Sequence, residues 1–122
     1  MEALLKALAD RTRLRILGLL DSGEVCVCHL HTSLRLPQPT VSRHLAYLRR
    51  AQLVAARKEG LWVHYRLDMP SDRVLRAFVE TVVHGTTHLS TWPNDRRRLE
   101  EATGCCVEAI PSESDLSCCS TS

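Results

Sequence analysis

Apolar residues recur at helical spacing through most of the chain, in segments separated by Gly, Pro, Asp and Ser. In one segment Val41, Leu45 and Leu48 form an apolar line, while small polar and cationic residues occupy the other faces. One apolar side and one polar side are typical of a helix packed on a core. The same reasoning predicts helices over residues 2–8, 11–20, 28–34, 39–50, 72–89 and 95–102.

Capping and breaking residues set the expected ends of these helices. Asp10 is placed to cap the second helix and Ser71 to cap the long helix at 72–89. Asp21-Ser22-Gly23 breaks the second helix, and Gly104 is expected to end the last one.

The helices at 28–34 and 39–50 are joined by a short turn, and the second helix carries small polar residues and Arg near its start, a combination that predicts a helix-turn-helix. Two strand-like runs, 53–58 and 61–67, follow at once around Gly60, a pattern that predicts a β-hairpin. A further brief strand is allowed near Val25. The fold class is therefore mainly α with a small β-hairpin, a winged helix-turn-helix.

The terminal helices carry more apolar surface than so small a domain needs, which indicates a partner subunit. We expect a homodimer formed by one face of the first helix and one face of the long helix. The residues assigned to this interface are Leu4, Leu5, Leu8, Leu75, Phe78 and Val82.

The chain has 122 residues, of which 44% are hydrophobic, enough for one domain with a modest core. We assign that domain to residues 1–103 and a flexible Cys-containing tail to residues 104–122. No apolar run approaches about 18 residues and no signal-peptide pattern stands at the start, so we expect a cytoplasmic protein that does not enter a membrane.

Charge is distributed unevenly along the chain. Residues 1–70 hold 11 Lys or Arg against 6 Asp or Glu, whereas residues 104–122 hold none against 3. The basic part is the part with the helix-turn-helix, which favours double-stranded DNA as a partner, although many solvated surfaces carry a similar excess. A two-fold dimer would read an inverted-repeat operator.

Small polar and cationic side chains near the start of the second helix of the motif are suited to base edges, and cations near the hairpin are suited to phosphates. The alternative is an ordinary amphipathic helix and a hairpin that only covers the core. The residues assigned to DNA are Gln38, Thr40, Ser42 and Arg43 for reading, and Arg57 and Lys58 for phosphates.

Six cysteines come as three close pairs, Cys26/Cys28, Cys105/Cys106 and Cys118/Cys119. Without an export signal, reduced thiolates for a metal or for redox chemistry are favoured over disulfides. A thiol oxidoreductase or metal carrier would need a thioredoxin-like alternation of strands and helices, and the pattern has none. No catalytic constellation stands out, so we do not expect an enzyme.

Four stretches, residues 8–17, 24–30, 38–45 and 60–67, match one family in order and spacing. Through them the chain resembles the ArsR/SmtB family of bacterial metal-responsive repressors, and Cys26-Val27-Cys28 is the mark of its arsenic-sensing branch. It implies a homodimeric winged-helix repressor that leaves its operator when ligand binds. Three positions depart from the family pattern: His31 replaces a third cysteine, Arg11 replaces a proline, and Pro37 replaces a serine.

The resemblance implies trivalent arsenic or antimony as inducer, since these soft ions prefer three sulfurs. Cys26 and Cys28 would supply two. The expected third donor is Cys105 or Cys106, an exogenous thiol, or hydroxide. The alternative is a separate site in the tail, formed by Cys105 and Cys106 with Cys118 or Cys119. Methylarsenite, which needs only two thiolates, and zinc or cadmium are the alternative inducers.

Helix geometry suggests a switch. Residues i and i+2 point about 200° apart on a helix, so Cys26 and Cys28 are expected to chelate one ion only if that turn unwinds. A separate zinc site is conceivable at His84 and His88, which are spaced i, i+4, although a pair of exposed histidines is the simpler interpretation.

Overall fold

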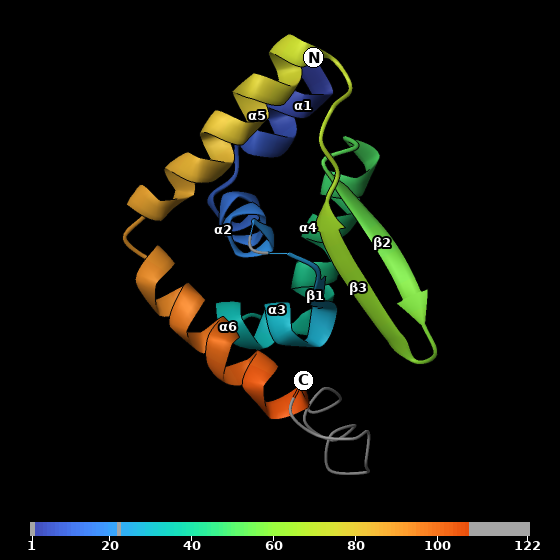
Figure 1. The fold of residues 1–122 in the computed structure, drawn as a ribbon, viewed down its shortest axis with the longest axis vertical. Coiled ribbons are helices and arrows are strands. Elements are labelled where there is room, and N and C mark those ends of the chain that lie inside the picture. The colour runs from blue at the N-terminus through green and yellow to red at the C-terminus, as the bar shows by residue number, and fades with distance from the viewer. Residues whose placement is uncertain (1, 22, 108–122) are drawn as a thin grey trace.

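The computed structural model describes residues 2–21 and 23–107. It confirms a winged helix-turn-helix in which helices surround α2 and a hairpin projects beside α4 (Figure 1). The elements are α1 (Glu2–Leu8), α2 (Arg11–Leu20), β1 (Val25–Cys26), α3 (Val27–Leu34), α4 (Gln38–Arg50), β2 (Val54–Glu59), β3 (Trp62–Leu67), α5 (Arg73–Gly85), the 3-10 helix η1 (Thr86–His88) and α6 (Trp92–Val107).

Helix starts follow the capping rules, with one correction. Asp10 caps α2 as predicted, because its Oδ1 accepts from the amides of Thr12 and Arg13 at 2.8 and 3.2 Å. The cap of α5 is Asp72, not Ser71: the Asp72 carboxylate accepts from the first amides of that helix. Asp72 directly precedes the first residue of the helix, so its carboxylate occupies the N-cap position that the sequence had assigned to Ser71.

Two helices also differ in extent from the sequence-based expectation. The long helix stops at Gly85 and continues only as the single 3-10 turn η1. The last helix begins earlier, at Trp92, and passes through Gly104 to Val107. Glycine weakens a helix interior by only about 1 kcal/mol, which packing of α6 against α3 offsets.

The sheet is antiparallel with strand order β1-β3-β2. The predicted hairpin is confirmed, with Val54 opposite Leu67 and Glu59 opposite Trp62. Gly60 takes φ 61° at the turn, a left-handed conformation that glycine adopts without strain. The two-residue strand β1 pairs with β3 through Val25 with Tyr65 and Cys26 with His64, which attaches the start of α3 to the wing.

The core lies between α2 and the helices around it. The apolar line of α4 is fully buried, since Val41, Leu45 and Leu48 are each 0% exposed. Gly18 of α2 lets η1 approach closely, because a Cβ there would stand 2.5 Å from Thr86 Oγ1. Among residues 2–21 and 23–107, no helix is both long and apolar enough to span a bilayer.

Candidate thiol site and nucleic-acid interface

The two cysteines of the Cys-Val-Cys motif converge. Cys26 ends β1 in an extended conformation (φ −69°, ψ 142°), and Cys28 lies in the first turn of α3. Their Sγ atoms are 2.9 Å apart, and both side chains are buried. The prediction that chelation must unwind the helix is therefore wrong: Cys26 stands outside the helix, where the 200° relation does not apply.

The electrostatic surroundings of Cys26 favour its thiolate form. A hydrogen bond from the Cys28 thiol lowers the pKa of Cys26 to about 6, against an opposing effect of burial. The backbone amides of Cys28 and His29 and the nearby His64 act in the same direction. A sulfur at the start of a helix faces amide dipoles that stabilise negative charge, which favours the thiolate form of Cys26.

Two residues of β3 complete the surroundings of the thiols. Trp62 packs against Cys26 and Cys28, and His64 is the cross-strand partner of Cys26. No local pattern in the sequence places Trp62 and His64 beside the thiols. The possible strand near Val25 pointed to a neighbouring strand, but the sequence does not identify which strand it pairs with.

A third donor is not assembled by the described side chains. His31 is buried on α3, where burial lowers its pKa, and its Nε2 has no hydrogen-bond partner in the described structure. Among the described residues no three His, Cys, Asp or Glu are grouped so that they could hold a metal ion.

The remaining cysteines fall at the end of the chain. The backbone of Cys105 and Cys106 belongs to α6, but their side chains lie outside the described structure. Cys118 and Cys119 lie outside the described residues.

His84 and His88 are not aligned on one helix. His84 belongs to α5 and His88 to η1, and the α-helix ends between them at Gly85. Both are exposed, and neither belongs to a metal-binding group among the described residues.

The residues predicted to read DNA lie in the first half of α4 and differ in exposure. Pro37 precedes α4, and Pro39 occupies its first turn, where missing amide donors cost nothing. Arg43 is exposed, whereas Gln38, Thr40 and Ser42 are half-buried. All four lie on the helix that carries the buried line of Val41, Leu45 and Leu48, so the core fixes which face of α4 is left for solvent.

The two predicted phosphate contacts of the wing differ. Arg57 forms ion pairs with Glu24, which precedes β1, and with Glu59 on its own strand. The Arg57 guanidinium lowers the pKa of Glu24, and both carboxylates raise the pKa of Arg57. Lys58 is exposed on the same strand. To contact a phosphate, Arg57 would have to give up its ion pairs with Glu24 and Glu59. Lys58 does not belong to these ion pairs, so it could contact a phosphate without breaking them.

The apolar face assigned to dimerisation is partly internal. Leu4 and Leu8 are only 7% and 8% exposed and belong to the core of the chain itself. Leu5 and Phe78 are 45% and 43% exposed. Both line a small apolar groove of about 110 Å³ between α1 and α5, with Leu4, Val74 and Leu75.

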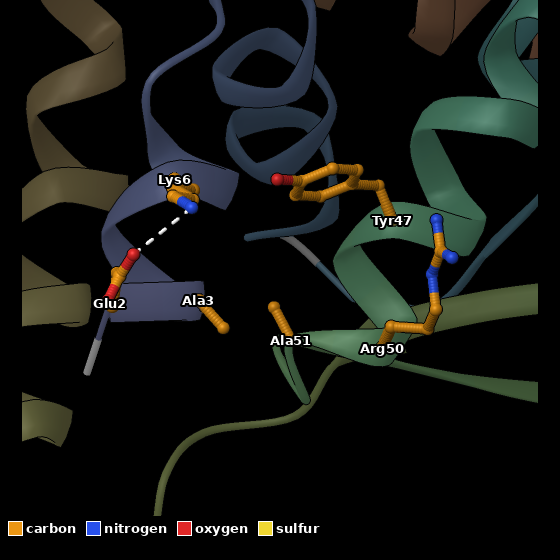
Figure 2. Close-up of a pocket in the computed structure, with 6 residues that line it drawn as sticks. All are labelled: Glu2, Ala3, Lys6, Tyr47, Arg50 and Ala51. Carbon is orange, nitrogen blue, oxygen red and sulfur yellow. Dashed lines mark ion pairs between the residues drawn. The ribbon is translucent and has the colours of Figure 1, made fainter.

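A larger hollow lies between α1 and the end of α4. Its volume is about 500 Å³. Figure 2 shows the Glu2–Lys6 ion pair on one side of it and Tyr47 and Arg50 on the other. The ion-pair side chains are 82% and 64% exposed, so solvent screens them. The hollow is an open surface groove, and we assign no chemistry to it.

The sequence is similar to those of known regulatory proteins. A model described as bacterial regulatory protein, arsR family, matches residues 10–56. The arsenical resistance operon repressor of Escherichia coli K12 is 58% identical over 65 residues, 52% of this chain and 56% of that protein. The arsenic resistance transcriptional regulator ArsR1 of Pseudomonas putida KT2440 is 46% identical over 79 residues, 64% and 62% of the two chains.

A solved structure is also similar. The structure of HlyU from Vibrio cholerae N16961 matches with a TM-score of 0.58 and 40% identity, covering 67% of this chain and 86% of that one. The chain spans less than two thirds of the length of the two arsenic regulators, 56% and 62%.

Proposed function

Because the chain belongs to the ArsR family of bacterial regulatory proteins, we propose that it is a transcriptional repressor released from its operator by trivalent arsenic or antimony. The observation that carries the proposal is the pair of buried thiols whose sulfurs converge to 2.9 Å at the start of α3. The arsenic regulators of E. coli and P. putida support this choice of inducer.

Two adjacent thiolates form a chelate for a soft ion but supply only two of the three sulfurs that arsenite favours. We assign the third to Cys105 or Cys106. In support, α6 packs along α3 and its backbone continues to Val107 (Figure 1). His31 is the poorer donor for arsenic, because an imidazole nitrogen is harder than a thiolate.

Operator recognition is assigned to the outward half of α4. Arg43 has the exposure and the fork of donors needed for a bidentate contact to a guanine edge. Gln38, Thr40 and Ser42 would read neighbouring positions, and Lys58 on the wing would contact a phosphate with Arg57 as a second cation. One such helix reads few base pairs, so useful specificity requires a two-fold dimer on an inverted repeat.

The homodimer is assigned to the exposed apolar edge of α1 and α5. Leu5, Val74 and Phe78 leave apolar surface in water, at 45%, 73% and 43% exposure. Burying such surface against a second copy is favourable by about 25 cal/mol per Å². A sample that sediments as a monomer yet binds operator fully would contradict this assignment.

The inducer site is tested with thiol variants and an operator-release assay. Cys26→Ser and Cys28→Ser should bind operator within about twofold of the wild type but lose release by sodium arsenite, because the DNA contacts lie on α4. The matched control is the Cys118→Ser, Cys119→Ser double variant, which should respond normally. Normal arsenite release in a Cys26→Ser, Cys28→Ser protein would overturn the assignment.

The third sulfur has its own test. Changing Cys105 and Cys106 together to Ser should weaken release by arsenite yet spare release by methylarsenite, which carries a methyl group in place of one sulfur. Parallel titrations with antimonite, zinc and cadmium identify the preferred ion. Unchanged arsenite release in this variant would mean that a small thiol or hydroxide completes the site.

The DNA assignment is tested by comparing operator with random DNA. Arg43→Ala should cost about 1–3 kcal/mol on the operator and relax the preference at one position. Lys58→Ala should weaken binding to all sequences alike and reduce the salt dependence. Equal losses on operator and random DNA for Arg43→Ala would remove that residue from the reading set.

A further inference from the structure

The last turn of α3 leads directly into α4 and ends in four carbonyl groups that its own helix leaves without amide donors. Two are satisfied by the backbone that follows. The Leu36 amide donates to the His31 carbonyl at 3.1 Å, and the Arg35 amide donates to the Thr32 carbonyl at 3.2 Å. Arg35 adopts the left-handed conformation that this helix ending requires.

The other two carbonyls are satisfied by side chains from two different helices. Arg98 of α6 donates through Nε to the Ser33 carbonyl at 2.6 Å, and Arg15 of α2 donates through Nη2 to the Leu34 carbonyl at 3.3 Å. The joint between α3 and α4 is therefore held half by its own backbone and half by α2 and α6.

One carboxylate orients both arginines. Asp95, 1% exposed, accepts from Arg15 Nε and Nη2 at 2.8 Å each and from Arg98 Nη2 at 2.9 Å. Charge-assisted bonds of this length are strong, and the two-point pairing with Arg15 fixes the carboxylate plane. We call Asp95, Arg15 and Arg98 the clamp.

The helix that carries the clamp also reaches toward the thiols. Beyond Arg98, α6 passes along α3 toward the end that joins β1 (Figure 1). Cys105 lies seven positions after Arg98, about 10 Å along the helix, and Ser33 lies five positions after Cys28, about 7 Å. One rigid element thus connects the C-terminal joint of α3 with the part of the chain proposed to complete the inducer site.

We propose that α6 transmits inducer binding to α4, and we call this role of α6 the lever. Asp95 and Arg98 are positioning residues that move the start of α4 when α6 moves. The inference rests on the proposed function. When an arsenical draws Cys105 or Cys106 toward Cys26 and Cys28, α6 shifts along α3 and the clamp carries the joint with it. The DNA-reading residues of α4 follow directly after that joint, so ligand and operator compete through one element.

The test measures coupling separately from ligand binding. Arg98→Gln removes the bonds to Ser33 and Asp95 but leaves Arg15 on Asp95. The matched control, Arg96→Gln, alters a guanidinium of the same helix that pairs with the exposed Glu100 at 3.1 Å. Operator Kd is measured by fluorescence anisotropy with and without sodium arsenite, and arsenite binding by thiolate absorbance in the near ultraviolet.

Arg98→Gln should bind arsenite within about twofold of the wild type, while the ratio of operator Kd values with and without arsenite falls at least about fivefold. Arg96→Gln should keep the wild-type ratio. In a Cys105→Ser, Cys106→Ser background, Arg98→Gln should cause no further fall. A ratio within about twofold of the wild type for Arg98→Gln would overturn the lever.

A second variant covers poor folding of the first. Arg98→Lys keeps the positive charge beside Asp95, but a single ammonium cannot reproduce the planar fork that spans Asp95 and Ser33. It should also lose coupling, and wild-type coupling in this variant would equally overturn the lever. If arsenite fails to release the wild-type protein, the proposed function fails instead, and that outcome is visible without any variant.

Discussion

The two ends of α3 are built from opposite kinds of chemistry. At its N-terminal end, a sulfur takes the position that Ser, Thr, Asp or Asn usually holds, and the neighbours of Cys26 are the Cys28 thiol and Trp62. At its C-terminal end, the buried Asp95 carboxylate and two guanidinium groups satisfy the last carbonyls.

This difference indicates which end can change. Thiols make weak hydrogen bonds and polarisable contacts, so exchanging them for a soft ion costs little. The buried Asp95 carboxylate cannot be removed without leaving both Arg15 and Arg98 without their shared counter-charge. A ligand at the N-terminal end therefore acts on a helix whose far end stays bonded to Arg98 of α6 and Arg15 of α2.

The largest effect is expected from breaking the charged end. Asp95→Ala leaves Arg15 and Arg98 without their shared carboxylate and should lower the free energy of unfolding by about 3–5 kcal/mol, measured by urea denaturation. Glu100→Ala, which removes a 64% exposed partner of Arg96 on the same helix, should cost about 0–1 kcal/mol. Equal losses in the two variants would show that the clamp is no stronger than a surface pair.

An intermediate effect is expected at the thiol end as pH changes. The pKa of Cys26 is lowered to about 6 by the Cys28 thiol. A lowered pKa contributes stability that is complete above the unfolded pKa of about 8.5 and is lost as the pH falls toward about 6. The free energy of unfolding should therefore rise between about pH 7 and pH 8.5, by up to about 1.4 kcal/mol per pH unit.

The control for this prediction is Cys26→Ser, which should flatten the slope under reducing conditions. Burial also lowers the pKa values of His29 and His31. These histidines reduce stability only as the pH falls below about 6.5, outside the chosen window. A slope that persists unchanged in Cys26→Ser would assign it to other groups.

The smallest effect is expected at the joint itself. Arg35 has φ 56°, a conformation that costs a residue with a Cβ about 1–2 kcal/mol. Arg35→Gly removes that strain from the folded state, but it also raises the conformational entropy of the unfolded chain. The two effects oppose each other, so the variant should be more stable by less than about 1 kcal/mol in thermal unfolding. Gln52→Gly, at φ 63° after α4, is the matched control and should behave alike. A clear loss confined to Arg35→Gly would mean that its side chain contributes to the joint.

Sequence by itself determined the elements and the chemistry they carry. The buried line of Val41, Leu45 and Leu48, the Asp10 cap and the Gly60 turn are all local, since each depends on residues within a few positions of one another. The Cys-Val-Cys motif and its resemblance to arsenic regulators likewise depend on neighbouring residues alone.

Tertiary structure alone decided how those parts meet. Cys26 and Cys28 converge because β1 pairs with β3, which holds Cys26 outside the helix opposite His64. Leu4 and Leu8 became core residues because the rest of the chain covers α1. The spacing rules that locate helices act over about four residues, whereas Arg15 and Asp95 are 80 residues apart. Only the packing of α6 across α2 and α3 brings that arginine and carboxylate together.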